Sequence, residues 1–238
     1  MENGIFAREQ MLFGEAAMRV LSEKHVAVFG LGGVGGHAAE ALVRSGVGAL
    51  TIVDHDTVSE SNRNRQIVAL SSTQGQLKTE VLGKRLLDIN PALSLTACPV
   101  FFGPDNAARF PFSEYDYVLD CVDTVSAKLL LLECCRKADV PILASMGTGN
   151  KTDPTRLRVG DIETTSVCPL ARVLRREVRK RGISGYRVIW SDEPPLSPRT
   201  ETEEGVAPST PGSTAFVPSS AGILMAREAV MSFLRELP

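Results

Sequence analysis

Residues 25–66 read HVAVFGLGGVGGHAAEALVRSGVGALTIVDHDTVSESNRNRQ, and this stretch predicts the fold class. An apolar run at 25–30 predicts a buried strand, and the glycines that follow open a predicted helix at 33–45. A second apolar run, at 49–53, ends at Asp54. This order of strand, glycine turn, helix and strand is the context that a nucleotide-binding G-x-G-x-x-G motif requires.

The rest of the chain continues the alternation of strands and helices. The other expected strands are 93–100, 117–122, 141–145, 156–162 and 186–191, and the other expected helices are 7–21, 74–89, 124–139, 169–181 and 219–237. Alternation of this kind predicts right-handed crossovers and a mostly parallel, doubly wound sheet, so the expected class is a Rossmann-like α/β fold. Ligands then bind beyond the carboxyl ends of the strands.

Composition narrows the function classes. The 238 residues are 43% apolar, which is enough for one sizeable core, and the net charge of -2 does not indicate a nucleic-acid partner by itself. The start of the chain lacks the pattern of a signal peptide, and no apolar run is long enough to span a bilayer, so we expect a cytoplasmic protein without membrane association. Five cysteines without C-x-x-C spacing argue against a disulfide framework and a four-cysteine zinc site.

The glycine-rich turn and the acid after the second strand are the candidate nucleotide site. Gly30, Gly32, Gly33 and Gly35 allow a tight turn and a close approach of the backbone to phosphate. The helix that follows offers free N–H groups and the positive end of its dipole. Asp54 stands where a carboxylate accepts hydrogen bonds from ribose hydroxyls.

Charged residues near these strand ends favour ATP over NAD. Arg63 and Arg65 follow the acidic segment, Lys78 lies on the next helix, and Asp123 follows a later strand. Attack on the α-phosphorus of ATP builds negative charge that cations and a metal ion stabilise, whereas hydride transfer needs no such cluster. Asp123 is therefore the candidate ligand for Mg²⁺. Taken singly, each residue also fits a surface charge or, for Asp123, a helix N-cap.

A second charged feature lies on the helix expected at 169–181. Its cations recur at i, i+3, i+4 and i+7 and continue to the helix end: Arg172, Arg175, Arg176, Arg179, Lys180 and Arg181. This spacing predicts a basic face opposed only by Glu177. Like charges this close repel by a few tenths of a kcal/mol per pair, which a polyanion offsets. From the spacing alone, RNA contact and a solvated face both remain open.

Three further residues are weaker candidates. Cys168 begins the basic helix, where the helix N-terminus and the arginines favour a thiolate, so it is a candidate nucleophile for an acyl group. A buried packing role is the favoured alternative. Lys151 and Asp153 lie in the loop MGTGNKTDPT at 146–155, where lining an acceptor pocket, contacting RNA or simply connecting two strands are the alternatives.

Four segments together resemble the ubiquitin-activating-enzyme-like superfamily of adenylating proteins: GLGGVGG at 30–36, IVDHDTVSESNRNRQ at 52–66, GQLKTEVLGKRLLDINP at 75–91 and DCVDT at 120–124. The resemblance implies an ATP site made by Gly30, Gly32, Gly33, Gly35, Asp54, Asp56, Asn62, Arg65, Gln66, Lys78 and Asp123. It implies catalytic roles for Arg65, Lys78 and Asp123, the last through Mg²⁺. It also implies a homodimer in which Arg8 reaches the phosphates of the partner subunit.

A narrower resemblance covers almost the whole chain. The segments at 8–18, 29–48, 123–128, 144–155, 159–183 and 211–230 are similar to the tRNA threonylcarbamoyladenosine dehydratases. This implies ATP-dependent adenylation of the threonyl carboxylate of N6-threonylcarbamoyladenosine beside the anticodon, followed by cyclisation with release of AMP and pyrophosphate. It also turns the basic helix into a predicted tRNA contact, with no role for DNA. By analogy, a sulfur-transfer or desulfinase-system partner and a monovalent cation are further candidates.

The domain prediction follows from both resemblances. Residues 1–150 form the expected ATP-binding adenylating domain, and 151–238 form an α+β extension that packs on the same core and completes the substrate site. Five prolines among polar residues predict a mobile loop at about 192–213. Two alternatives remain: an adenylyltransferase that activates the C-terminus of a ubiquitin-like sulfur carrier, and an NAD-binding oxidoreductase or non-catalytic nucleotide sensor.

Overall fold

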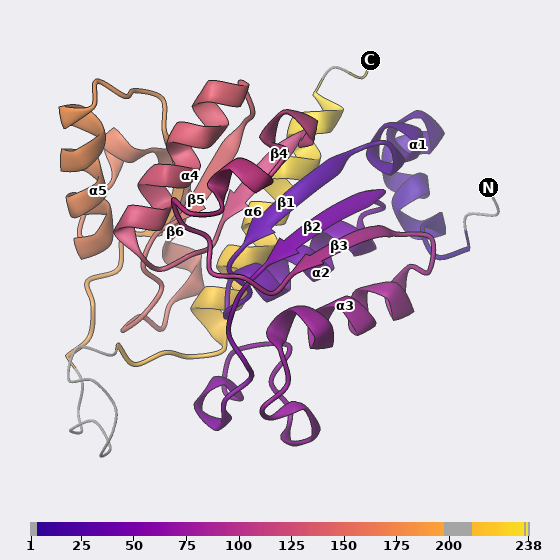
Figure 1. The fold of residues 1–238 in the computed structure, drawn as a ribbon, viewed down its shortest axis with the longest axis horizontal. Helices are drawn as coiled ribbons and strands as arrows, with labels where there is room; N and C mark the ends of the chain where they lie inside the picture. Colours follow the sequence, from indigo (N-terminus) through magenta and orange to yellow (C-terminus); the bar gives the residue numbers. More distant parts are fainter. Residues whose placement is uncertain (1–3, 198–210, 236, 238) are drawn as a thin grey trace.

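The computed structural model describes residues 4–197, 211–235 and 237, and its α/β architecture is the one that the sequence predicts (Figure 1). Within these residues, seven strands form one sheet: β1 (His25–Phe29), β2 (Ala49–Val53), β3 (Ser94–Cys98), β4 (Tyr117–Asp120), β5 (Ile142–Ser145), β6 (Leu157–Asp161) and β7 (Arg187–Ser191). Their order is β3-β2-β1-β4-β5-β7-β6. All neighbours are parallel except β6 and β7, so the prediction of a mostly parallel sheet is confirmed.

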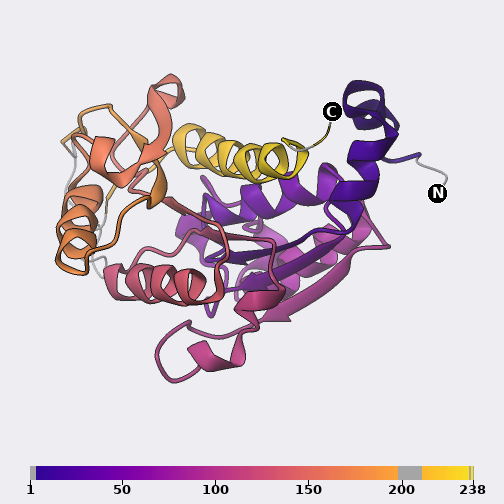
Figure 2. The same cartoon turned by 90° about the horizontal axis from the view of Figure 1, so that it is seen from above.

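Six α-helices within the described residues cover the two faces of the sheet: α1 (Ala7–Ser22), α2 (Gly35–Arg44), α3 (Lys78–Ile89), α4 (Val125–Ala138), α5 (Pro169–Lys180) and α6 (Phe216–Leu234). Side chains alternate along each strand, so Val26 and Val28 belong to the core under α1, α2, α3 and α6. Phe29 belongs to the core on the opposite face, under α4. Figure 2 shows α6 and α4 on opposite sides of the sheet. The fold is therefore doubly wound.

The strand order reverses beside β1. β2 and β3 extend the sheet on one side of β1, while β4 and β5 extend it on the other. Loops that leave the carboxyl ends of β1 and β4 consequently diverge to opposite faces and leave a crevice between them. This crevice is where the fold places a ligand.

Two expected helix boundaries were wrong. α3 begins at Lys78 rather than at residue 74, because Gly75 has a φ of +80° and Leu77 forms a β-bridge with Thr57. α6 runs from Phe216 to Leu234 rather than from 219 to 237. Its first turn contains Pro218, a position where the missing N–H has no helical partner to lose.

The residues after 150 enlarge the same sheet. β7 pairs with β5, β6 pairs with β7, and α6 packs against α2. The functional boundary at residue 150 stays a prediction, and so does the mobile loop, because residues 198–210 lie outside the described part of the chain. Within the described residues, no helix has both the length and the apolar content needed to cross a membrane.

Candidate active site

A cavity of about 570 Å³ opens at the carboxyl ends of β1, β2 and β4. Ten of the eleven residues that the sequence predicts for nucleotide binding line it: Gly30, Gly32, Gly33, Asp54, Asp56, Asn62, Arg65, Gln66, Lys78 and Asp123. They come from three connections, those from β1 to α2, from β2 to α3 and from β4 to α4, which the strand order brings to one sheet edge.

The glycine turn is shaped by close backbone contacts. Gly30 has a φ of +87°, and a Cβ there would lie 2.6 Å from the carbonyl oxygen of Cys121, in the loop after β4. Gly35, the predicted residue that does not line the cavity, supports the turn from below, since its Cβ would lie 1.8 Å from the oxygen of Gly30. Both positions therefore require glycine.

Asp54 is buried and already oriented. Its Oδ2 accepts from the Leu31 N–H at 2.6 Å, and its Oδ1 accepts from the Asp56 N–H at 2.8 Å. These bonds fix the carboxylate between the glycine turn and the loop after β2. Each carboxylate oxygen has a second lone pair, so Asp54 retains capacity to accept from a ribose hydroxyl.

Lys78 is the first residue of α3, and only 4% of its surface is exposed. Its N–H donates to the Asp56 carbonyl at 3.0 Å, and its Nζ lies 2.7 Å from the Asp56 Oδ2. The alternative that Lys78 is a solvated helix lysine is thus wrong. Its single ion pair holds the ammonium group inside the cavity, where a phosphate oxygen can replace the Asp56 carboxylate.

Arg65 reaches the cavity from a short 3-10 turn, Glu60–Asn62. Asn62 is buried, and its Oδ1 accepts from the Ser59 N–H at 3.2 Å, which closes the turn. The Arg65 guanidinium donates to the Ser61 carbonyl and the Asn64 Oδ1, with no carboxylate partner among the described residues. Burial lowers the pKa of Arg65 below its ordinary value. An anion can therefore bind Arg65 without breaking an ion pair.

Two predictions about nearby residues change. Arg63 does not line the cavity; its Nη1 lies 3.6 Å from the Glu60 Oε1, on the outside of the turn. The prediction that Gln66 binds the nucleotide gains support. Its buried Oε1 has no hydrogen-bond partner in the described structure, and the residue lines the cavity. Such an acceptor is available to a donor on a ligand.

Asp123 is exposed in the cavity wall, and no hydrogen bond or ion pair engages its carboxylate within the described residues. The N-cap of α4 is Thr124, without a side-chain cap bond, so Asp123 is not the helix cap that the alternative reading assumed. Mg²⁺ binds through one or two carboxylates together with phosphates and water. The free carboxylate of Asp123 fits that donor set.

The acids after β2 fit a metal less well. Asp54, His55 and Asp56 place ligand atoms within 4.8 Å of one another. Asp54, however, is occupied by two backbone N–H groups, and Asp56 holds Lys78. Asp123 therefore remains the better metal ligand.

Part of the cavity wall was missed in the sequence. Val100, Phe101 and Phe102 follow β3 and line the cavity beside His55. The rings of His55 and Phe101 meet edge to face at 5.0 Å. The signal was available, since β3 ends at the same sheet edge as β1 and β2.

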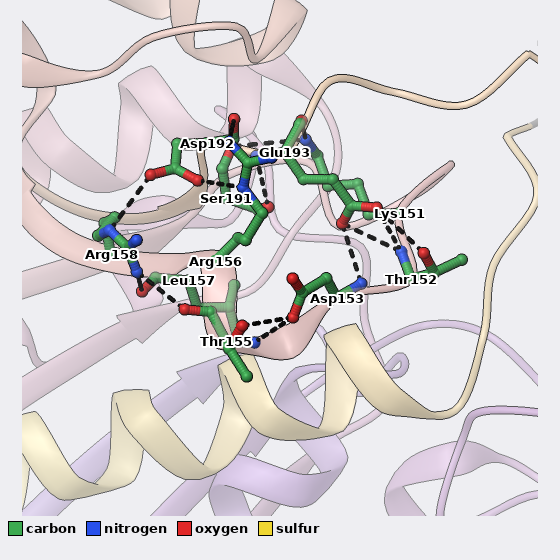
Figure 3. A network of polar contacts seen from close by, with 10 residues as sticks. All are labelled: Lys151, Thr152, Asp153, Thr155, Arg156, Leu157, Arg158, Ser191, Asp192 and Glu193. Carbon is green, nitrogen blue, oxygen red and sulfur yellow. Dashed lines mark hydrogen bonds and ion pairs between the residues drawn. The ribbon is translucent and has the colours of Figure 1, made fainter.

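Three of the predicted site residues lie elsewhere. Cys168 is 3% exposed and belongs to a core cluster with α4 and α5, which favours the packing role. Lys151 is also buried, and its Nζ donates to the carbonyls of Ser191 and Glu193, so it serves the structure rather than a pocket or RNA (Figure 3). Burial is the main cause that lowers the pKa of Lys151. Arg8 is exposed on α1 and does not line its own subunit's cavity.

Asp153 and the basic helix also need correction. The Asp153 carboxylate caps the short turn Pro154–Arg156 through the Thr155 N–H and hydroxyl, as Figure 3 shows. On α5, Glu177 is not the only acid that opposes the arginines. Glu163 pairs with Arg179, and Glu133 pairs with Arg181. Glu163 lies in the short turn that precedes α5 and Glu133 lies on α4, so the helical spacing within α5 could not reveal either pair.

Comparison with known proteins agrees with this geometry. Residues 6–236 match the model of the ThiF family. The chain is 42% identical, over 98% of its length, to the tRNA threonylcarbamoyladenosine dehydratase of Bacillus subtilis, of which it covers 95%. The structure matches the Escherichia coli tRNA N6-threonylcarbamoyladenosine dehydratase in complex with AMP at a TM-score of 0.88 and 34% identity, and in complex with ATP at 0.86 and 33%. Each match covers 96% of this chain and 93% of the other.

Proposed function

The chain belongs to the ThiF family, and from this premise we propose that it is an ATP-dependent dehydratase that acts on N6-threonylcarbamoyladenosine in tRNA. The observation that carries the proposal is the extent of the likeness to a dehydratase, which spans 98% of the chain and therefore includes the part after residue 150. The cavity adds a physical reason, since it gathers Lys78, Arg65 and the free Asp123 beside a glycine turn.

The first step of the proposed reaction joins the substrate to ATP. An oxygen of the threonyl carboxylate attacks the α-phosphorus, the bond from that phosphorus to the bridging oxygen breaks, and pyrophosphate leaves. Lys78 and Arg65 stabilise the charge that grows on the phosphate oxygens. A carboxylate is already ionised at neutral pH, so this step needs no strong general base.

The second step removes AMP. The carbamoyl group attacks the carbonyl carbon of the acyl-adenylate within the same molecule, a ring closes, one proton is lost, and the AMP oxygen leaves. The nucleoside has then lost one water overall. Asp54 and Gln66 would keep the nucleotide in place during both steps by accepting from its hydroxyl or amino groups.

Mg²⁺ belongs to the proposal as the ion that Asp123 would hold. When bound, it would supply positive charge that neutralises phosphate oxygens. The monovalent cation stays a prediction from resemblance, as do a sulfur-transfer or desulfinase partner and a cytoplasmic location.

The homodimer is a further part of the proposal. Met11 is 84% exposed and Leu12 is 74% exposed on α1, and Ile5, which precedes the helix, is 61% exposed. Exposed large apolar side chains that form one patch mark an interaction site, and we infer such a patch from these residues. Arg8 is exposed on the same helix. We propose that a second subunit covers this surface, and that Arg8 of each subunit then lies near the cavity of the other.

The alternatives are not favoured. A sulfur-carrier adenylyltransferase would use the same nucleotide chemistry, but the B. subtilis relative that matches almost the whole chain is a dehydratase. An NAD-dependent oxidoreductase or a nucleotide sensor is not favoured, because the similar E. coli structures hold ATP and AMP.

Mass spectrometry of tRNA nucleosides tests the function. tRNA that carries uncyclised N6-threonylcarbamoyladenosine is incubated with the protein, ATP and Mg²⁺, and the expected product has lost one water. The reaction without ATP and the Lys78→Ala variant serve as controls. An unchanged nucleoside, together with pyrophosphate exchange stimulated by a ubiquitin-like carrier protein, would contradict the proposal.

A further inference from the structure

The cations of α5 do not share one face. Ala171, Leu174 and Val178 are buried and fix how the helix is turned. Arg181 consequently faces α4, where it lines a groove together with Glu133 and Glu177. The outward surface of α5 is left with the arginines of the i, i+3, i+4, i+7 series and Lys180.

The C-terminal half of the helix is neutralised within the protein. Arg179 binds Glu163 through two contacts of 3.0 Å from its Nε. Lys180 lies 3.0 Å from Glu177, and Arg181 lies 2.8 Å from Glu177 and 3.1 Å from Glu133. The pKa values of Glu163 and Glu177 are both held below the ordinary range, chiefly by these hydrogen bonds. A phosphate could bind here only by displacing carboxylates.

The N-terminal half differs. Arg172 is exposed, and the structure gives it no acidic partner among the described residues. The Arg176 side chain is 71% exposed, and its nearest carboxylate oxygen, on Glu177, is 3.9 Å away and already shared with Lys180. Arg175 is tied to Thr165 through bonds of 2.6 and 2.7 Å. Within the described residues, Arg172 therefore has no acidic partner, and Arg176, one helical turn away, has only a long contact with a carboxylate that Lys180 also binds.

The position of this pair on the helix also favours an anion. Arg172 lies near the N-terminal end, where the helix dipole is positive and a cation is unfavourable. The first turn of α5 contains no acid to compensate. A bound phosphate would relieve both the repulsion between Arg172 and Arg176 and the repulsion of Arg172 by the positive helix end.

The chemistry of the surface fits a phosphate backbone better than a protein. Protein interfaces usually have an apolar core, but the exposed Val173 of α5 lies on the groove side, beside α4. Arginine forks match phosphate oxygens. α5 also begins close to the active-site edge, since a methyl group at Gly147, in the loop after β5, would lie 3.7 Å from the Cys168 Sγ.

We propose that the protein binds the tRNA backbone through Arg172 and Arg176, and that Arg179, Lys180 and Arg181 serve the internal packing of the C-terminal half instead. This inference rests on the proposed function, because that function is what identifies the RNA as tRNA. It replaces the six-cation face expected from the sequence with a two-arginine contact.

Two double variants with the same change of charge on the same helix test this division. Arg172→Gln/Arg176→Gln is expected to weaken tRNA binding about tenfold or more near 100 mM salt, and to reduce the slope of log affinity against log salt by about 1 to 2. Arg179→Gln/Arg181→Gln is expected to lose less than about threefold, as long-range charge alone allows. In turnover assays, the first variant should raise KM for tRNA and leave kcat unchanged.

The outcomes separate the inference from the function. Equal losses in both double variants, or an unchanged affinity in Arg172→Gln/Arg176→Gln, would overturn the two-arginine contact while the wild-type protein still dehydrates tRNA. A wild-type protein that neither binds nor dehydrates tRNA would overturn the proposed function as well. The unfolding midpoint and the ATP affinity without tRNA show whether each variant has folded.

Discussion

Lys78 and Asp123 line the same cavity, but they differ in burial and in their contacts with other side chains. Lys78 is buried and held by one carboxylate, so its charge is in place before a ligand arrives. Asp123 is exposed and unengaged within the described structure, so its carboxylate can take a ligand directly. A preorganised cation and a free metal ligand are what an enzyme needs where charge grows on transferring phosphate.

The first prediction concerns these two residues. Lys78→Ala and Asp123→Ala should each slow ATP–pyrophosphate exchange by about 10²- to 10³-fold, because each removes stabilisation of transition-state charge. Lys84→Ala, an exposed position on the same helix α3, is the matched control and should keep full activity. Unchanged exchange in both site variants, with intact thermal unfolding, would contradict the assignment.

Residue type and place in the chain could predict most of the cavity. Glycines, acids and cations after parallel strands converge because the strand ends do. Charge and position alone did not separate Arg65 from Arg63; the resemblance named only Arg65, and the structure places Arg65 but not Arg63 in the cavity wall. The sequence could not show that Cys168 and Lys151 are buried, because their neighbours come from distant segments.

At the scale of elements, β4 and α4 are joined by a fully buried ion pair. The Lys128 Nζ lies 3.0 Å from the Asp120 Oδ1, and both side chains have no exposed surface. The Tyr186 hydroxyl of the C-terminal half donates to the other oxygen at 3.2 Å. Burial raises the pKa of Asp120, and Lys128 counteracts that effect. The pair therefore fixes the start of the loop that carries Asp123.

The second prediction follows from this pair. Lys128→Met should destabilise the protein by about 3–5 kcal/mol, because it leaves the Asp120 carboxylate buried without a counter-charge. The double variant Asp120→Asn/Lys128→Met should recover part of the loss, since neither charge remains. Chemical denaturation at pH 7 measures both, and a double variant no more stable than Lys128→Met would argue against this account.

The third prediction concerns the strand end after β7. Glu193 is buried, which raises its pKa, but the N–H groups of Asp153 and Thr152 and the Thr152 hydroxyl outweigh burial and hold the pKa below 4.5 (Figure 3). A lowered carboxylate pKa adds stability above the unfolded pKa, and that stability is lost as pH falls through the folded value.

Glu193→Gln should therefore lower the unfolding temperature most at pH 7, and the gap from wild type should narrow as pH falls below about 4. Thermal scans between pH 7 and pH 3 measure the gap. Glu80→Gln, at an exposed acid of α3, should leave a small gap at all pH values. If the difference in unfolding temperature between Glu193→Gln and the wild type stays constant with pH, the ionised carboxylate of Glu193 is not the source of the stability.

Elements were predictable where local pattern decides them. The seven strands of the described residues were expected near their observed positions. Apolar runs bounded by turns mark the buried strands β1, β2 and β4, whereas β3 and β6 are mostly not buried. The start of α3 was misplaced because a β-bridge between Leu77 and Thr57 is a tertiary contact. Local periodicity does not contain such contacts, so helix ends that meet another segment were the least predictable boundaries.

At the scale of the whole molecule, the alternation of strands and helices was enough to predict a mostly parallel sheet and a ligand site at the carboxyl ends of its strands. It was not enough to predict the order of the strands. The reversal at β1 and the antiparallel β6 depend on how the halves of the chain pack, and α6 lies on the face of α2 across a long sequence separation. The charge division on α5 likewise required the positions of Glu133 and Glu163.

The last prediction tests whether one subunit is a complete enzyme. Arg8→Ala and Lys78→Ala should each inactivate the protein. If Arg8 acts on the partner's phosphates, as its exposed place on α1 beside Met11 and Leu12 suggests, mixed dimers contain one site with both groups intact. Random mixing then restores about one quarter of the wild-type activity. Light scattering checks whether the wild-type protein and both variants are dimers. A mixture no more active than its components would place Arg8 in its own subunit's site, or outside catalysis.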